Sequence, residues 1–207
     1  MALPEGANNQ TIVPPKYIGN VRCFWHNEEG IPRITIGPNW CFSILLFLIV
    51  GCVLYTSTVS LANMIKRGAA WYWILLGIFL IIFGLFCFFK TLLGDPGIPK
   101  EVYEHYARPY LCKPALPATD EKGFNLCKEC SVVYLIPERE HCDLCNVCVD
   151  DPDHHCVFFT KCIARHNVAY FRLAIVMFVL NMTYFVVIYG LIILRPKSNA
   201  HHAVKHL

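Results

Sequence analysis

The sequence predicts an α-helical membrane protein in which three transmembrane helices are combined with a cysteine-rich, metal-binding module between the second and the third. Of the 207 residues, 56% are hydrophobic and only 16% are charged, which is poorer in charge than a soluble domain usually is. Three long stretches contain no charged residue. Seven of the twelve cysteines fall between Cys127 and Cys162.

The first membrane helix is predicted at 39–64, within the charge-free interval between Arg33 and Lys66. A helix needs about 20 apolar residues to cross the hydrocarbon core of a bilayer, and this interval supplies them. The preceding segment, 1–38, lacks the basic start, short apolar core and cleavage site of a signal peptide. We therefore expect the first helix to stay in the mature protein.

The second membrane helix is predicted at 70–89, and it opens with a Trp-Tyr-Trp triplet typical of the membrane–water interface. Only a few residues around Lys66 separate it from the first helix, so the two are expected to form a tight hairpin. The segment 1–38 and the module at 90–170 then lie on the same side of the membrane.

The third membrane helix is predicted at 173–194, between Arg172 and Arg195, and is followed by a tail at 195–207. Buried helices of a soluble core are the alternative for all three stretches. That alternative is disfavoured because the chain offers no amphipathic helices to surround them.

The distribution of charge sets the expected topology. Most of the 18 Lys and Arg precede the first predicted helix or lie between the second and the third, and the positive-inside bias places these segments in the cytosol, where thiols stay reduced. The net charge of +3, without a basic cluster interleaved with aromatics, argues against a nucleic-acid partner. We expect an integral protein of endomembranes (endoplasmic reticulum or Golgi) or of the plasma membrane, with the lipid bilayer as a partner.

The module contains three pairs of cysteines separated by two residues, and a tight turn between such cysteines aims both sulfurs at one tetrahedral zinc ion, about 2.3 Å away. Eight side chains have the right type and spacing, enough for two four-coordinate sites: Cys127, Cys130, His141, Cys142, Cys145, Cys148, His155 and Cys162. Closed sites leave no position for water. Both Zn²⁺ ions are therefore predicted to be structural, contributing about 10 kcal/mol or more of folding free energy.

Cys156 is left over by this count, at the end of the tetrad Asp153-His154-His155-Cys156. In an extended backbone His154 and Cys156 share a face, whereas His155 points the other way, toward the metal. His154 is therefore the predicted base for the Cys156 thiol, and Asp153 orients its imidazole after a turn that Pro152 favours. The alternative is that Cys156 is one more zinc ligand and that catalysis is absent.

In these residues the sequence resembles the DHHC-type protein S-acyltransferases, also called palmitoyltransferases, over roughly residues 40–194. Besides the cysteine pairs and the Asp-His-His-Cys tetrad, the resemblance includes the following residues in the family's order: Asp95, Pro96, Gly97, Cys162, Asn167 and Phe171.

The resemblance implies a two-step reaction, in which Cys156 takes an acyl group, typically palmitoyl, from acyl-coenzyme A and passes it to a membrane-proximal cysteine of a substrate protein. It also implies the ligand set of each ion. One zinc is held by Cys127, Cys130, His141 and Cys148, and the other by Cys142, Cys145, His155 and Cys162. Polar residues of the third helix, Asn181, Thr183 and Tyr184, either line an acyl cavity or bond a neighbouring helix.

The sequence also departs from the family pattern. It shows no fourth transmembrane span and no Thr-Thr-x-Glu motif, which leaves open a divergent enzyme and a truncated isoform. If the sequence is an incomplete product, the helical bundle would lack one wall. Near the tetrad, Val157, Phe158, Lys161 and Ala164 replace the family's proline, tryptophan, asparagine and glycine. The sequence therefore leaves open a catalytically inactive, membrane-anchored zinc protein that acts as an interaction or scaffold module. A RING-like ligase is disfavoured because the Cys-x-His-x-x-Cys centre is missing.

Overall fold

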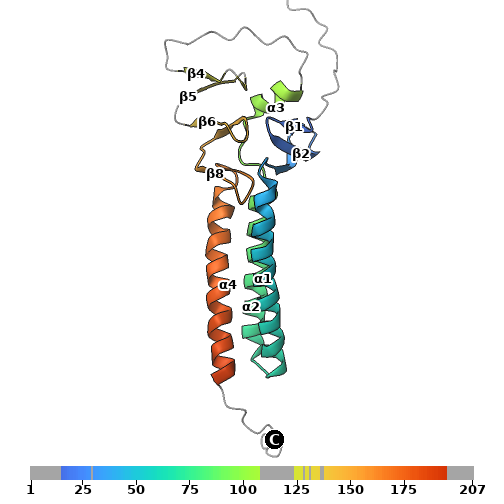
Figure 1. The fold of residues 1–207 in the computed structure, drawn as a ribbon, viewed down its shortest axis with the longest axis vertical. Coiled ribbons are helices and arrows are strands. Elements are labelled where there is room, and N and C mark those ends of the chain that lie inside the picture. Colours follow the sequence, from blue (N-terminus) through green and yellow to red (C-terminus); the bar gives the residue numbers. More distant parts are fainter. Residues whose placement is uncertain are drawn as a thin grey trace, which may run out of the picture. The chain divides into compact units, whose positions relative to one another are not determined.

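The computed structural model describes residues 15–28, 30–107, 124–127, 129–130, 132–135 and 138–194 (Figure 1). The predicted tail at 195–207 lies outside these residues. The chain divides into two compact units. One contains residues 1–45 and 89–171, and the other contains residues 46–88 and 172–207.

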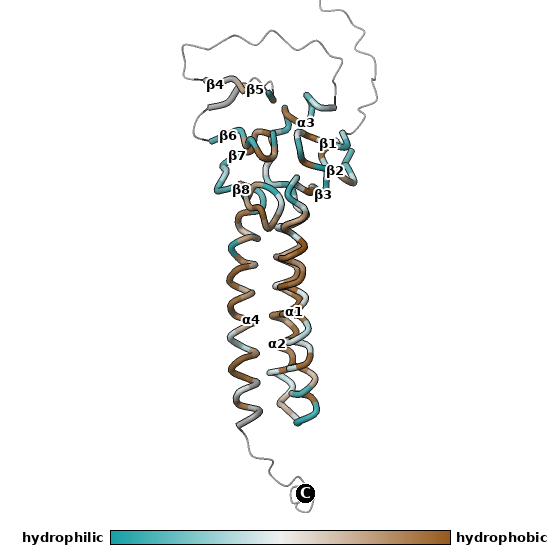
Figure 2. The backbone as a smooth tube through the Cα atoms, in the orientation of Figure 1, coloured by the Kyte–Doolittle hydropathy of each residue, from teal (hydrophilic) through white to brown (hydrophobic). Residues whose placement is uncertain are grey.

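Three helices dominate the second unit and continue across its boundaries: α1 (Trp40–Lys66), α2 (Trp71–Leu93) and α4 (Val168–Leu194). Within the described part of the chain, these are the three helices long and apolar enough to cross a membrane. Figure 2 shows them as mostly hydrophobic along their length. The protein is therefore an integral membrane protein.

A tight turn joins α1 to α2. Gly68 takes a positive φ of 68°, its amide donates to the Ile65 carbonyl at 3.0 Å, and the Ala69 amide donates to the Met64 carbonyl at 3.0 Å. This is a Schellman cap, in which a glycine adopts the left-handed conformation without steric cost and satisfies the last helical carbonyls. The short connection makes α1 and α2 antiparallel neighbours.

Two of the helices run past the charge-free intervals. Helix α2 continues through Lys90 to Leu93, and α4 begins at Val168, one turn before Arg172. A long basic side chain can end a charge-free interval without ending a helix, because its aliphatic stem stays on apolar surface while its charge reaches water. The charged residues therefore bound the apolar spans but not the helices.

Polar side chains join the helices of the second unit. Asn181 on α4 donates from Nδ2 to the Ser57 hydroxyl on α1 at 3.1 Å, and the Tyr184 hydroxyl donates to the Trp73 carbonyl on α2. Of the two roles considered for polar residues on this helix, the structure shows the bond to a neighbouring helix for Asn181 and Tyr184.

The other unit begins with a small sheet. It lies in the segment 1–38, for which the sequence predicted a cytosolic location but no secondary structure. Its antiparallel strands are β1 (Tyr17–Ile18), β2 (Val21–His26) and β3 (Pro32–Ile36). Alternating residues Val21 and Cys23 of β2 face inward and are buried. They pack in one core with Ile18, Ile98, Val102, Tyr103 and five cysteines of the module, Cys127, Cys130, Cys145, Cys148 and Cys162.

The segment after α2 connects this sheet to the cysteine-rich module. The Asp95 carboxylate accepts hydrogen bonds from the Gly97 and Ile98 amides, each at 3.2 Å, and from the Tyr103 hydroxyl at 2.9 Å. Gly97 has a φ of +115°, which favours glycine. Tyr103 belongs to the short helix α3 (Lys100–Ala107), so this turn sets where the helix begins.

The module itself consists of three two-stranded antiparallel hairpins. They pair β4 (Phe124–Cys127) with β5 (Val132–Leu135), β6 (Arg139–Cys142) with β7 (Val147–Asp150), and β8 (His154–Cys156) with β9 (Lys161–Ile163). Hairpins this short are not stable alone in water, so additional crosslinks are needed to hold them together.

Candidate metal centres and nucleophile

The β6–β7 hairpin divides its ligands between two sites. His141 lies directly opposite Cys148 in the strand register, so both side chains project from one face. Cys142 follows His141 along β6 and therefore projects from the opposite face. One hairpin thus contributes to two different metal sites.

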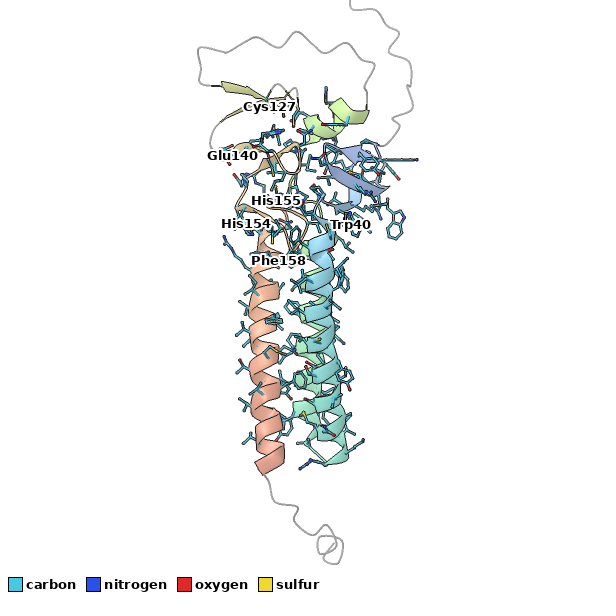
Figure 3. All side chains as sticks on the ribbon, viewed as in Figure 1. Trp40, Cys127, Glu140, His154, His155 and Phe158 are labelled. Carbon is cyan, nitrogen blue, oxygen red and sulfur yellow. The ribbon has the colours of Figure 1, made fainter. Side chains whose placement is uncertain are left out.

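The β8–β9 hairpin repeats this arrangement with a second His–Cys pair. His155 lies directly opposite Cys162, and its two neighbours on β8, His154 and Cys156, project from the other face. The extended backbone predicted for His154–Cys156 is therefore present. Figure 3 shows where His154 and His155 lie in this hairpin.

The first group of ligand atoms gathers around Nδ1 of His141. The Sγ atoms of Cys127 and Cys130 each lie 3.4 Å from it, and that of Cys148 lies 3.8 Å away. The second group gathers in the same way around Nδ1 of His155, with Cys142, Cys145 and Cys162 at 3.4, 3.3 and 3.8 Å. These are the same two sets of four that the family resemblance implied, and within each set the ligand atoms lie within 4.8 Å of one another.

The distances fit tetrahedral zinc. Bonds of about 2.3 Å to sulfur and about 2.0–2.1 Å to nitrogen, at tetrahedral angles, separate S from N by about 3.6 Å and two sulfurs by about 3.8 Å. The observed S···N distances are 3.3–3.8 Å, and Cys145 and Cys162 have their sulfurs 3.7 Å apart. Both clusters could therefore hold a metal ion without rearrangement.

The charges favour the same conclusion. A hydrogen bond from Cys148 lowers the pKa of the Cys130 thiol to about 5, while the same contact raises the pKa of Cys148. Three sulfurs this close cannot all ionise unless a cation neutralises them, and a divalent ion makes every one of them a thiolate. A closed set of three thiolates and one imidazole is the donor set of a structural zinc site.

Further groups surround the ligands. The Cys130 amide donates to Cys127 Sγ and the Cys145 amide to Cys142 Sγ, each at 3.4 Å, as the knuckle turns predict. On the far side of the His141 ring, a Glu129 carboxylate oxygen lies 3.2 Å from Nε2, but the two make no hydrogen bond and Nε2 has no other partner among the described residues.

The second ring has a partner that sequence reasoning missed. The Asn39 amide lies 3.0 Å from Nε2 of His155, although 116 residues separate the two along the chain. No spacing or motif signals a contact across such a separation, so only the fold could reveal it.

Cys156 belongs to neither cluster. Its side chain is buried, on the same face of β8 as the exposed His154. The Asp153 carboxylate lies 3.0 Å from Nδ1 of His154, so Nδ1 holds the ring proton and Nε2 is the nitrogen available to a substrate or a thiol. Among the described residues, no hydrogen bond joins His154 to Cys156, and catalytic contacts often tighten only when substrate binds.

Aromatic side chains fix the His154 ring. Phe171, in the first turn of α4, meets it edge-on with ring centroids 5.3 Å apart, and Phe159 packs against Phe171 at 5.7 Å. Phe158, which replaces the family's tryptophan, is 45% exposed. Phe171, an element of the family resemblance, thus acts by holding the imidazole.

Lys161, another departure from the family pattern, is fully buried opposite Cys156 in the β8–β9 register. Its ammonium group donates to the backbone oxygens of Thr35 and Gly94 and to the Thr35 hydroxyl. Burial lowers the pKa of Lys161 to about 7, partly offset by the charge of Asp95. Lys161 therefore ties β9 to β3 and to the end of α2.

Comparison with known proteins agrees with this geometry. Residues 120–206 match the family model for the DHHC palmitoyltransferase domain. The chain is 30% identical to mouse palmitoyltransferase ZDHHC8 over 148 residues, which is 69% of this chain and 18% of the relative. It is also 31% identical to palmitoyltransferase ERF2 of Candida glabrata over 112 residues, 49% of this chain and 31% of the relative, and 29% identical to zebrafish ZDHHC5-A over 146 residues, 68% and 18%.

The chain thus spans about a third or less of the lengths of these relatives. The matched domain contains the Asp153–Cys156 tetrad and both ligand clusters, and the matches to the relatives extend beyond it. On the strength of this domain and these relatives, the chain belongs to the DHHC-type S-acyltransferase family.

Proposed function

We propose that this protein is a protein-cysteine S-palmitoyltransferase in which Cys156 carries the acyl group. One observation carries the proposal. Of the described cysteines between 127 and 162, Cys156 alone joins neither metal cluster, and it shares a strand face with His154, whose ring is oriented by Asp153. A thiol beside an oriented imidazole is the arrangement of an activated nucleophile.

The first step loads the enzyme. Nε2 of His154 accepts the Cys156 proton, the thiolate attacks the thioester carbonyl of acyl-coenzyme A, and a new C–S bond to Cys156 forms. The C–S bond to coenzyme A then breaks, and the departing thiolate takes the proton from His154. Asp153 stabilises the imidazolium between these events.

The second step passes the acyl group on. The thiol of a substrate cysteine gives its proton to His154 and attacks the Cys156 thioester, after which the Cys156 thiolate leaves and recovers that proton. One thioester is exchanged for another in each step, so no external energy source is needed. The same base serves twice.

The metal centres have a structural part in this proposal. Two bound zinc ions would supply folding free energy and, being closed by four protein ligands each, no position for substrate. Cys127, Cys130, His141 and Cys148 would hold one, and Cys142, Cys145, His155 and Cys162 the other. Together the two ions would fix hairpins too short to persist alone and so present Cys156 in one orientation.

Chain connectivity supports substrates at the membrane. Cys156 precedes Val168, the first residue of a membrane-spanning helix, by twelve residues (168 − 156). A sixteen-carbon acyl chain is worth about 12 kcal/mol of transfer out of water, so it stays in lipid during the reaction. We therefore infer that the substrates are proteins with membrane-proximal cysteines, modified on the cytosolic face of endomembranes or of the plasma membrane.

Acyl labelling tests the proposal. Purified protein incubated with an alkyne analogue of palmitoyl-coenzyme A is expected to gain label that hydroxylamine removes, and Cys156→Ser is expected to lose it. Cys52→Ser, which removes an exposed thiol of α1, is the matched control and keeps the label. Equal labelling of the wild type and Cys156→Ser would refute Cys156 as the acyl carrier.

A wild-type protein that holds two zinc ions and takes no label would instead support the inactive scaffold that the sequence left open. The geometry around His154 favours the enzyme, because a scaffold needs no oriented imidazole beside a free thiol.

A further inference from the structure

We propose that Asn39 is a positioning residue of the second metal centre, holding the ring of His155 and, through it, the strand that carries Cys156. The Asn39 amide lies 3.0 Å from Nε2 of His155. Asn39 immediately precedes α1, far outside the family domain at 120–206. The inference rests on the proposed zinc at the second cluster.

The chemistry of the ring decides which end of the amide faces it. Three sulfurs surround Nδ1 of His155 at 3.3–3.8 Å, so Nδ1 is the metal-binding nitrogen and must be unprotonated. A neutral imidazole then carries its proton on Nε2, which becomes a donor. The structure places Nδ2 of Asn39 against Nε2. Because the amide nitrogen and oxygen of asparagine are interchangeable in shape, we assign Oδ1 to this position, where it accepts the proton.

This contact locks the tautomer. With Oδ1 facing Nε2, the alternative form of His155, protonated on Nδ1, would place two acceptors against each other and could not bind the ion. Removing a group that orients a ligand histidine in this way typically lowers metal affinity by about 10- to 100-fold. With Oδ1 toward the ring, Asn39 therefore favours the metal-binding form of His155.

Asn39 does not act alone, because the segment 35–39 makes hydrogen bonds to the β8–β9 hairpin on both sides of Cys156 along the chain. The Gly37 amide donates to the Thr160 hydroxyl at 3.0 Å, in the loop after Cys156. Lys161, in the next position, donates to Thr35 at 2.8 Å. The hairpin is thus held before Cys156 through His155 and after it through Thr160 and Lys161.

Substitutions at Asn39 test whether its side chain acts as a hydrogen-bond acceptor or only fills space. Asn39→Asp keeps an acceptor and cannot donate, so it preserves the contact if His155 is the donor. Asn39→Ala removes the acceptor. Asn20→Ala is the matched control, because Asn20 also donates a side-chain hydrogen bond to the module, to the Leu144 carbonyl at 3.1 Å, without touching a ligand ring.

The measurement is zinc content per protein by elemental analysis, together with the rate of zinc release to a chromogenic chelator, on the full chain in detergent. Asn39→Ala is expected to release one of its two ions about 10- to 100-fold faster than the wild type, whereas Asn39→Asp and Asn20→Ala release both at wild-type rates. Neither readout depends on acyl transfer.

Each other outcome counts against the proposal. Wild-type release from Asn39→Ala overturns it while leaving the acyltransferase intact, and so does fast release from Asn39→Asp, which would make Asn39 a donor. Equal acceleration of both ions would show general unfolding and also overturns it. A wild-type protein without zinc removes the metal centres themselves, and Cys156 labelling then decides the proposed function separately.

Discussion

The ammonium group of Lys161 donates hydrogen bonds to both the backbone oxygen and the hydroxyl of Thr35, each at 2.8 Å and across 126 residues of sequence. Burying an ammonium is costly unless its donors are satisfied, and here the Gly94 carbonyl completes the set. Lys161 therefore links the N-terminal sheet to the hairpin that carries Cys156.

Replacing Lys161 is expected to destabilise the protein. In Lys161→Met the Thr35 carbonyl loses a donor inside the core, which costs about 1–3 kcal/mol if it is left unsatisfied, whereas the Gly94 carbonyl keeps the Thr35 hydroxyl as a donor. The midpoint of thermal unfolding in detergent should fall accordingly. Arg33→Met, which removes an exposed cation from the same strand as Thr35, serves as the control and should leave the midpoint unchanged.

A single methyl group at Gly37 is expected to separate the same two elements. A Cβ at this position would overlap the backbone oxygen of Thr160, whereas nothing lies within 4 Å of a Cβ at Gly51. Because a backbone atom cannot move aside, Gly37→Ala should lower the free energy of unfolding by about 1–3 kcal/mol, the usual range for overpacking. Gly51→Ala should be neutral or slightly stabilising, and a similar loss in both variants would contradict this close approach.

His154 of the tetrad should respond to substitution differently from a metal ligand such as Cys142. His154→Ala is expected to slow acyl loading by about 10²-fold to 10⁴-fold, the usual contribution of a general base, and to keep both zinc ions. Cys142→Ser should release an ion and unfold the module, because it opens a closed site. Elemental analysis of both variants checks this, and zinc loss from His154→Ala would abolish the division of roles.

Cys23 provides a pH-dependent test of the core. Burial, followed by the charge of Asp95, raises the pKa of its thiol to about 12, from an ordinary value of 9.0. The unfolded thiol therefore loses its proton first, so this contribution to stability is complete below pH 9 and is lost as the pH rises from 9 to 12.

Alkylation of Cys23 by iodoacetamide, followed by mass spectrometry, should accordingly be slow at pH 9 in the folded protein and fast in denaturant. Rapid native labelling at that pH would show that the N-terminal sheet opens.

The polar contact between the helices should be weakly stabilising. Hydrogen bonds between membrane helices average about 0.6 kcal/mol in double-mutant cycles. A cycle of Asn181→Ala and Ser57→Ala, followed by unfolding in detergent, is expected to give a coupling energy near that value. A coupling of zero would mean that other groups satisfy Asn181 equally well.

Much of the architecture was predictable because its signals are local. The membrane spans follow from charge-free intervals, and their approximate positions need no knowledge of the fold. The helix ends were less accessible, since α4 begins at Val168 rather than at the first residue after Arg172. Hydrogen bonding of the backbone, not the charge of one side chain, decides where a helix starts.

The candidate site was predictable to the level of residue types. Pairs of cysteines separated by two residues indicate zinc knuckles. The same spacing assigns eight side chains to two zinc ions and leaves Cys156 without a metal. The division of ligands between the two clusters was not derivable from spacing, because it depends on the register that places His141 opposite Cys148 and His155 opposite Cys162. Only the family resemblance supplied it in advance.

By itself the sequence determined the spans, the ligand chemistry and the spare thiol, because each depends on residues close together along the chain. Only the tertiary structure decided that the segment 35–39 holds the β8–β9 hairpin through Asn39, Gly37 and Lys161. Those contacts join residues more than a hundred positions apart. Such pairs meet only when the whole unit packs, because no local pattern of hydrophobicity or spacing encodes a partner at that separation.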